Sequence, residues 1–443
     1  MRRVLFTLLL LAAAVAQAQV GLPNVRLPPL PPVQAPQIDR ALGTAAGPTD
    51  ARELQQVRRL RVRELIRRNP GTLEADPSGA AIVRAEIVAL SPSASELAAA
   101  QAAGFVIARV HALDDLDLRV VVLRAPQGMT TARAFTQLRA LAPAAGLDFN
   151  HVYTESGVLD TNAEPVAKSE PVTTTDPLRQ ASTVGTEPHA KLGLIDSGVD
   201  LAHPVFKGVP VHQYGCAVVP VPAAHGTAVA SLMVGQSVDF HGAAPAAELY
   251  AADVYCGLPT GGSVDAVADA FAWLVGERVV VINASVVGPA NAILEAVVRS
   301  VIAHGHIIVA AVGNDGPAAA PLYPASYSGV VGVTAVDAHR HALIEAARGP
   351  QVRFAAPGAD MVAASSPRAF VLVRGTSFAA PLVAGLLAGK LRAPDHDAAA
   401  RAVADLAARA IDLGAPGPDP VFGDGLVGGD LGPAPRLAGV RAR

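Results

Sequence analysis

Two segments of the chain each place a residue with acid–base chemistry beside an apolar run. Asp196 follows the strand-like residues 192–195, and in open α/β sheets ligands gather beyond the carboxyl ends of the strands. His225 opens an apolar helical stretch, residues 228–234, and a helix start would hold its imidazole ring in a fixed orientation. Taken alone, Asp196 could be a turn residue and His225 one of 12 scattered histidines.

Two further segments present a hydrogen-bond donor and a nucleophile. Asn314 follows the apolar residues 310–312 and could offer its side-chain amide as a donor, although Asn-Asp-Gly is also good turn chemistry. Ser377 comes after Gly375 at the start of an apolar helical stretch that reaches Leu387. Free backbone N–H groups and the helix dipole favour an anion at that place. An ordinary N-cap serine is the alternative.

In combination, and in the order Asp196, His225, Ser377, these segments resemble the subtilisin-like serine protease family. Other segments that match the family, in the same order along the chain, are residues 282–285, 354–358 and 422–427. The resemblance covers about residues 188–430. It implies a serine-type endopeptidase, a hydrolase that acts on proteins or peptides.

The resemblance also implies a role for each of the four residues. A serine hydroxyl is a poor nucleophile until a base takes its proton. We expect His225 to be that base, Asp196 to orient its ring, and the amide of Asn314 to hold the oxyanion together with the backbone N–H of Ser377. An extended substrate would pair as an added strand with the expected substrate-binding residues Ser285, Val286, Val287 and Gly288.

The chain departs from the family at several positions. Ala228 stands where the family usually has a second, non-catalytic histidine, and Phe378 replaces a frequent methionine. Val287 replaces a glycine in the wall of the specificity pocket and should narrow or reshape that pocket. Residues 236–239 lack the ligand run of the family's calcium loop, so we predict no metal there and no cofactor, while calcium elsewhere stays open.

The elements that must position these residues alternate between apolar strands and helical stretches from Lys191 onward. Continuous apolar strands separated by helices are typical of a parallel sheet covered on both faces. The pattern therefore predicts an α/β domain, and the resemblance implies that it is a subtilisin-like catalytic domain over residues 188–432, with a short tail at 433–443.

Residues 80–153 predict a small α+β domain in front of the catalytic one. Their order is β-α-β-β-α-β, a split βαβ or ferredoxin-like arrangement, with a capping box formed by Ser93 and Glu96. In layout this domain resembles the family's propeptide, which implies an intramolecular inhibitor that the enzyme removes. Its end, residues 150–153, is where such propeptides are cut, so we expect cleavage near Tyr153 or in the following linker, 154–187.

The N-terminus has the features of a signal peptide. Arg2 and Arg3 precede an apolar stretch, and residues 16–18 form an A-x-A cleavage site. Residues 19–79 follow as a Pro-rich linker and an Arg-rich amphipathic helix at 52–68, for which a membrane-surface role is the less favoured alternative. Residues 1–18 predict export to the periplasm or the medium, with no transmembrane segment after their removal.

Two cysteines, Cys216 and Cys256, each end a strand-like run, residues 209–214 and 248–255. If the two strands are parallel neighbours, both thiols lie at the same sheet edge and can form one disulfide. Two separate buried thiols are the alternative.

Composition excludes several other classes. Charged residues make up 16% and the net charge is −3, so no global field favours nucleic acid. No metal-binding or phosphate-loop motif occurs. We expect a monomer, and the alternative function is a catalytically silent protein-binding module on the same fold.

Overall fold

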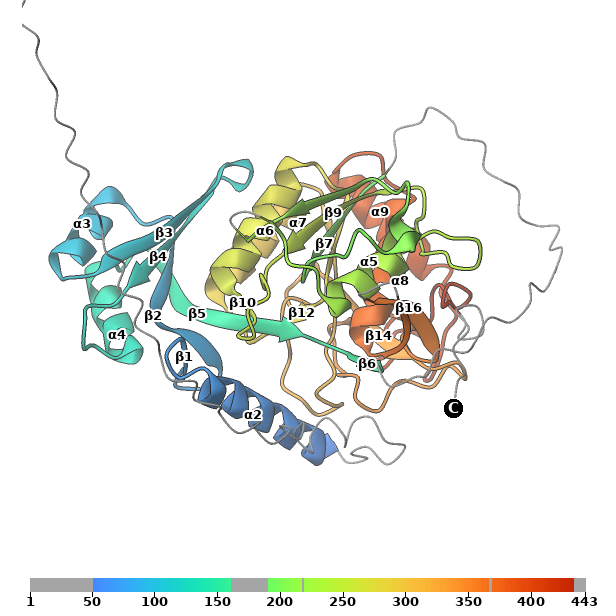
Figure 1. The fold of residues 1–443 in the computed structure, drawn as a ribbon, viewed down its shortest axis with the longest axis horizontal. Helices are drawn as coiled ribbons and strands as arrows, with labels where there is room; N and C mark the ends of the chain where they lie inside the picture. Colours follow the sequence, from blue (N-terminus) through green and yellow to red (C-terminus); the bar gives the residue numbers. More distant parts are fainter. Residues whose placement is uncertain (1–50, 161–189, 217–218, 366–368, 434–443) are drawn as a thin grey trace, which may run out of the picture.

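The structure is a computed structural model that describes residues 51–160, 190–216, 219–365 and 369–433. It contains an N-terminal domain, residues 73–155, and a C-terminal domain, residues 190–433, with helix α2 (Ala51–Arg68) lying beside both (Figure 1). The predicted signal peptide, the Pro-rich segment and residues 434–443 of the tail lie outside the described residues.

The N-terminal domain has the predicted order of elements, and its antiparallel sheet runs β5-β2-β4-β3. The capping box of Ser93 and Glu96 is confirmed at the start of α3. The elements are β1 (Leu73–Ala75), β2 (Ala81–Leu90), α3 (Ala94–Ala102), β3 (Val106–Leu113), η1 (Asp114–Leu116), β4 (Leu118–Arg124), α4 (Thr131–Leu141) and β5 (Gly146–Glu155). Helices α3 and α4 pack on one face of this sheet around Phe105 and Leu138.

The C-terminal domain is built on a parallel sheet in the order β15-β14-β13-β11-β7-β9-β8. After the short β6 (Val158–Asp160), its elements are β7 (Lys191–Asp196), η2 (Pro204–Phe206), β8 (Val211–Tyr214), α5 (Ala224–Val234), β9 (Glu248–Asp253), β10 (Gly262–Ser263), α6 (Val264–Gly276), β11 (Val281–Ala284), β12 (Val286–Val287), α7 (Ala292–Ala303), β13 (Ile307–Ala311), β14 (Val331–Val336), β15 (Val352–Pro357), β16 (Met361–Ser365), β17 (Ala369–Arg374), α8 (Thr376–Ala388) and α9 (His396–Ala407).

Both faces of the parallel sheet are covered, which is the physical reason for its continuously apolar strands. On β13, Val309 belongs to the core formed with α5 and α8, whereas Ile308 belongs to the core formed with α6 and α7. Figure 1 shows the two pairs of helices on opposite sides of the strands. The α/β fold class predicted from the sequence is confirmed.

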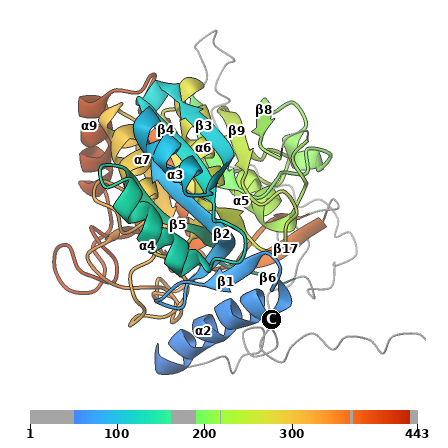
Figure 2. The ribbon, with the colours of Figure 1, turned by 90° about the vertical axis from the view of Figure 1, so that its left-hand side faces the viewer.

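The N-terminal domain packs against the C-terminal domain on the side of α6 and α7 (Figures 1 and 2). Strand β5 continues past its own sheet, and its last residues pair antiparallel with β10 and β12 of the C-terminal domain. Beyond it, β6 pairs antiparallel with β17. The sequence predicts the end of the domain at residue 153 and a linker from residue 154. Residues 154–155 and 158–160 are instead strand, because the C-terminal domain supplies the backbone partners that a linker would lack.

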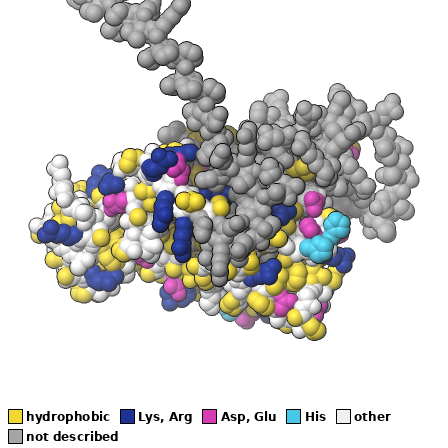
Figure 3. Space-filling model, turned by 90° about the horizontal axis from the view of Figure 1, so that it is seen from below, with side chains coloured by type: hydrophobic (Ala, Val, Ile, Leu, Met, Phe, Trp, Pro, Cys, Tyr) yellow, Lys and Arg dark blue, Asp and Glu magenta, His cyan; other side chains and the backbone are white. Residues whose placement is uncertain are grey.

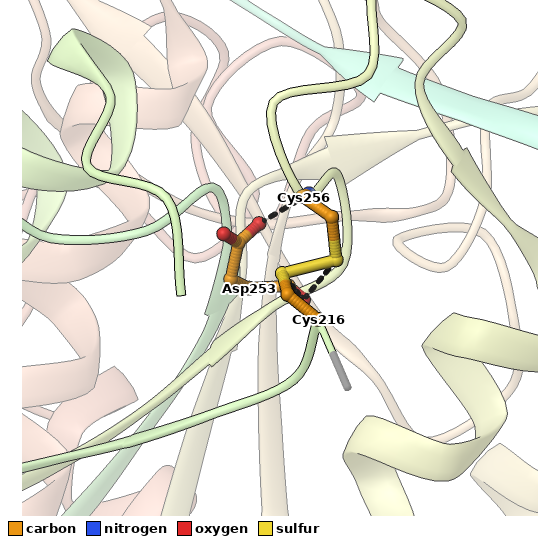
Figure 4. Close-up of side chains that lie close together, drawn as sticks. All are labelled: Cys216, Asp253 and Cys256. Carbon is orange, nitrogen blue, oxygen red and sulfur yellow. Dashed lines mark hydrogen bonds between the residues drawn. A yellow bond between two sulfur atoms is a disulfide. The ribbon is translucent and has the colours of Figure 1, made fainter. Parts of the chain in front are cut away.

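Strands β8 and β9 are parallel neighbours, as the cysteine argument required. Cys216 and Cys256, just beyond them, form a disulfide with a Cα–Cα distance of 5.1 Å. The carboxylate of Asp253 lies beside the bridge and accepts a hydrogen bond from the backbone N–H of Cys256 at 2.8 Å (Figure 4). The disulfide and this hydrogen bond therefore hold the backbone turn at this sheet edge in place.

Within the described residues, no helix is both long and apolar enough to cross a membrane.

Candidate active site

Asp196 and His225 lie together at the carboxyl end of the parallel sheet. Asp196 ends β7, is fully buried, and also accepts a hydrogen bond from the backbone N–H of Ser197 at 2.6 Å. His225 is in the first turn of α5, with Nδ1 at 2.9 and 3.0 Å from the two carboxylate oxygens of Asp196. This contact fixes the orientation of the ring and leaves Nε2 free to face the reacting groups.

The charges around His225 decide its protonation. Burial acts to lower its pKa, but the carboxylates of Asp196 and Glu155 and the hydrogen bond from Nδ1 raise the pKa to about 9. In this arrangement the imidazolium form of His225 is therefore favoured at neutral pH.

Asn314 is oriented by the residue that precedes the candidate nucleophile. It follows β13 after Gly313, and its Oδ1 accepts a hydrogen bond from the backbone N–H of Thr376 at 3.1 Å. The Thr376 hydroxyl in turn accepts from the N–H of Gly313 at 3.2 Å. With Oδ1 engaged in this way, the amide Nδ2 points the other way and donates to the Ser156 hydroxyl at 2.7 Å.

Ser377 lies in the first turn of α8 and is fully buried. Its hydroxyl has no hydrogen-bond partner among the described residues. The next residue, Phe378, places its ring 5.3 Å from the ring of His225. Ser377 thus lies at a helix N-terminus between Thr376, which binds Asn314, and Phe378, whose ring is near His225. No hydrogen bond joins its hydroxyl to His225 in the described structure. Backbone N–H groups at this helix start can receive an oxyanion.

Residues 153–157 of the same chain pass through this group of side chains. Thr154 pairs with Val287 and Glu155 with Val286, while Tyr153 pairs with Gly262 on the other side. The segment is an added strand held from both edges, the manner in which extended peptides bind exposed strands.

The peptide bond between Ser156 and Gly157 lies at the centre of the group. The carbonyl oxygen of Ser156 is 3.4 Å from Nε2 of His225. A Cβ added to Gly375 would lie 2.8 Å from the Cα of Gly157 and 2.9 Å from the amide nitrogen of Asn314. Only glycine at 375 permits this approach, so the backbone around Gly157 fits against the start of α8 without space to spare.

Tyr153, the fourth residue before that bond, anchors the segment. Its side chain is fully buried, and its hydroxyl donates to the carbonyl of Pro289 at 2.8 Å. A Cβ at Gly288 would lie 2.5 Å from the ring. The absence of a side chain at Gly288 therefore makes the space that the ring fills.

The predicted substrate-binding residues divide into two groups. Val286 and Val287 pair directly with β5, as expected of a substrate strand. Ser285 instead hydrogen-bonds the Ser377 carbonyl through its hydroxyl, at 3.3 Å, and Gly288 exchanges backbone hydrogen bonds with Tyr323 while it accommodates Tyr153. The positions of Thr376, Glu155 and the Ser156–Gly157 bond in this site were not predicted from the sequence. Their only sequence signal was proximity to Ser377 and to the predicted cleavage region.

The fold and the arrangement of these side chains agree with a comparison to known protein families. The model described as the Subtilase family matches residues 188–425, more than half of the chain, so the chain belongs to the subtilase family. The resemblance to the subtilisin-like family found in the sequence is therefore confirmed for residues 188–425.

Individual relatives agree with this assignment. The chain is 34% identical to the thermostable alkaline protease of Halalkalibacterium halodurans over 167 residues, which are 37% of this chain and 46% of that protein. It is 29% identical to subtilisin E of Bacillus subtilis over 216 residues, 46% of this chain and 55% of the relative. The chain thus spans about half the length of the relatives that it matches.

Among solved structures, the crystal structure of fervidolysin from Fervidobacterium pennivorans, a keratinolytic enzyme related to subtilisin, covers 79% of this chain with a TM-score of 0.62. The match covers 61% of the fervidolysin chain at 19% identity, so it supports the fold alone.

Proposed function

We propose that the chain is the precursor of an exported serine endopeptidase and that it cleaves itself between Ser156 and Gly157. The observation that carries the proposal is the path of residues 153–157, which lie as an added strand with that bond beside His225 and Gly375. Proteins or peptides with an extended segment would be the substrates of the mature enzyme, which we expect to act as a monomer outside the cytoplasm.

Each step of the hydrolysis has a residue to perform it. The Ser377 hydroxyl attacks the carbonyl carbon of Ser156 while Nε2 of His225 takes its proton, and Asp196 stabilises the imidazolium that forms. The Asn314 amide and the N–H of Ser377 receive the oxyanion. His225 then gives the proton to the leaving amine of Gly157, and water hydrolyses the acyl-enzyme. These groups supply the whole reaction, so we propose that it needs no cofactor.

The N-terminal domain would act as the inhibitor of the new enzyme. Its strand β5 holds residues 152–155 in the substrate position, and its sheet rests on α6 and α7. In the uncleaved chain the Asn314 amide donates a hydrogen bond to the Ser156 hydroxyl. The reaction instead requires this amide to donate to the carbonyl oxygen of Ser156. A small rotation of Ser156 would therefore precede cleavage.

The test is to express the full chain and its Ser377→Ala variant and to follow their masses and N-termini. The wild type should yield a fragment that begins at Gly157, and the variant should stay intact at this bond. A serine-directed fluorophosphonate should label the wild type and leave the variant unlabelled. A wild type that neither cleaves nor reacts would favour the silent binding module, and a variant that still trims itself when pure would refute self-processing.

A further inference from the structure

Helix α6 presents two carboxylates, those of Asp265 and Asp269, one turn apart on the side that faces the N-terminal domain. Strand β3 of that domain supplies the cations that they bind. Nε of Arg109 lies 2.8 Å from Oδ2 of Asp265, and the ring of His111 lies 3.2 and 3.1 Å from the two carboxylates. We refer to Asp265 and Asp269 as the α6 acidic pair.

The acidic pair is oriented by groups of the C-terminal domain itself. The hydroxyl of Ser263 donates to Oδ1 of Asp265 at 2.5 Å, and the hydroxyl of Tyr214 donates to Oδ2 of Asp269 at 2.7 Å. The ring of Tyr214 stacks on Trp273, one turn further along α6, with the ring centroids 4.8 Å apart. These contacts do not involve the N-terminal domain, so we expect the carboxylates to keep their orientation without it.

The segment that leads to the active site passes this pair. Residues 152–153 of β5 pair with β10, which ends two residues before Asp265. Further back along the chain, the side-chain amide of Asn291 in the C-terminal domain donates to the carbonyl of Phe149 at 3.0 Å. Between these two anchors, the amide of Asn150 donates to Oδ1 of Asp265 at 3.0 Å. The C-terminal domain therefore holds the backbone on both sides of position 150.

The charges of the chain are divided unequally at the Ser156–Gly157 bond. Residues 157–443 carry 18 basic and 25 acidic side chains, whereas residues 51–156 carry 13 basic and 11 acidic ones. Lys and Arg side chains gather on the side of the molecule where α2 lies, which belongs to this basic part (Figure 3). If the chain is cleaved at this bond, the acidic pair stays with an enzyme of net charge −7 and loses both of its cations.

We propose that the α6 acidic pair is an exosite of the mature enzyme for a basic side chain, arginine or lysine, at the seventh residue before the scissile bond. Asn150 holds that position in the precursor and reaches Asp265 with a neutral amide, while Arg109 supplies the charge from β3. A substrate that lacks such a second strand must bring the cation on the bound segment, and position 150 is the one that contacts the carboxylate. The inference rests on the proposed function and names a substrate preference away from the reacting bond.

Three peptides test the exosite on the mature enzyme, purified away from the N-terminal fragment. They carry residues 148–159, Asp-Phe-X-His-Val-Tyr-Thr-Glu-Ser-Gly-Val-Leu, with Asn, Arg or Glu at X and a quenched fluorophore pair at the ends. The arginine peptide should have a kcat/KM about fivefold above that of the asparagine peptide, the gain of one charge-assisted hydrogen bond at a partly exposed site. The glutamate peptide should be the poorest, because it places a third carboxylate beside the pair.

Variants assign the preference to the acidic pair. Asp265→Asn should bring the ratio of arginine to asparagine peptides close to one, and Asp269→Asn should lower it in part. The ratio is taken within each enzyme, so a general loss of activity cancels. Asp405→Asn on α9, an exposed acidic residue outside α6, is the matched control and should leave the ratio unchanged.

A measurement on the wild type keeps the test decisive if Asp265→Asn fails to fold, since Asp265 also contacts the N-terminal domain of the precursor. Raising the salt to about 1 M NaCl should bring the ratio of arginine to asparagine peptides towards one, because it screens charges at an exposed site. A ratio that is the same at low and high salt would contradict a charge-based exosite.

The outcomes separate the two proposals. An enzyme that cleaves the asparagine peptide but shows no preference for arginine, or one whose preference survives Asp265→Asn, overturns the exosite and leaves the endopeptidase standing. An enzyme that labels with fluorophosphonate and cleaves none of the three overturns both the exosite and the assigned bond.

Discussion

His225 lies close to two carboxylates, those of Asp196 and Glu155. Asp196 belongs to the C-terminal domain, whereas under the proposed function Glu155 would leave with the N-terminal fragment. Together they raise the pKa of His225 to about 9. A general base must be neutral to accept a proton, so we expect Glu155 to slow the proposed self-cleavage.

Replacing Glu155 with glutamine should therefore speed self-cleavage at neutral pH. In the wild type, the rate should rise with pH towards about 9 as His225 loses its proton. In Glu155→Gln the pKa falls, the profile moves to lower pH, and cleavage at pH 7 should be about tenfold faster for each unit of the shift. The measurement is the appearance of the Gly157 N-terminus between pH 5.5 and 10. Glu277→Gln, at the far end of α6, is the control, and an unchanged profile in Glu155→Gln would contradict the argument.

Position 157 requires glycine both because of its backbone conformation and because a neighbouring ring leaves no space for a side chain. Its φ is 140°, a conformation that favours glycine, and a Cβ there would lie 2.7 Å from the ring of Phe378. Gly157→Ala should slow self-cleavage by at least about tenfold, because both strain and overlap oppose the bound geometry. Gly128→Ala, also at positive φ but in the turn between β4 and α4 of the N-terminal domain, is the control and should leave the cleavage rate unchanged. Equal rates for Gly157→Ala and wild type would show that the segment binds differently.

At the scale of elements, β8 and β9 form the edge of the sheet next to the catalytic strand β7. Asp253 at the end of β9 is in register with Asp196 at the end of β7. The backbone beyond Asp253 is held by the Cys216–Cys256 bridge and by hydrogen bonds to the Asp253 carboxylate from Tyr255 and Cys256. The bridge therefore stabilises the sheet edge beside the active site without entering it.

Removing the bridge should lower stability and leave the chemistry in place. A Cys216→Ser, Cys256→Ser double variant of the Ser377→Ala chain should lose up to about 4 kcal/mol, the loop entropy for residues 40 apart in sequence. Thermal unfolding with and without reductant measures the loss. The control is that reductant changes the midpoint of the Ser377→Ala chain and not that of the double variant. Equal midpoints for all four samples would mean that the bridge does not stabilise the fold.

At the scale of the whole molecule, one carboxylate of α6 holds the two domains together. Asp265 is buried and accepts hydrogen bonds from Arg109 at 2.8 Å and from Asn150 at 3.0 Å, both in the N-terminal domain. His111 lies between Asp265 and Asp269, at 3.2 and 3.1 Å. Hydrogen bonds to these two carboxylates outweigh burial and raise the pKa of His111 to about 9.

This interface should weaken as the pH rises. The pKa of His111 is raised in the docked state, so its contribution is complete below about pH 6.5, its ordinary pKa, and is lost as the pH passes about 9. After cleavage, the N-terminal fragment should dissociate about tenfold faster at pH 9.5 than at pH 6, as followed by the release of peptidase activity. His111→Gln should dissociate fast at both values, and His339→Gln, exposed on a loop, should behave as the wild type. A pH dependence that persists in His111→Gln would assign the effect to other groups, such as His225.

The candidate site was predictable from the sequence to the extent that its residues lie in short, local patterns. Asp196 after an apolar strand, His225 and Ser377 at helix starts, and Asn314 after a strand each depend on their own few neighbours, and the parallel sheet brings such termini to one edge. The role of Thr376 was not predictable, because it depends on a hydrogen bond to residues 62 and 63 positions away.

The sequence alone determined the family, the two cores around an apolar sheet and the order of the N-terminal elements, since hydrophobic periodicity and capping are properties of neighbouring residues. Only the tertiary structure decided where residues 153–160 lie. Their residue types are typical of a linker. They are nevertheless strand, because β10, β12 and β17 offer backbone edges with which they pair. The same holds for Arg58 and Asp315, which are 257 positions apart and meet because α2 packs on both domains. Long-range pairing of this kind depends on how the domains dock, which no local pattern records.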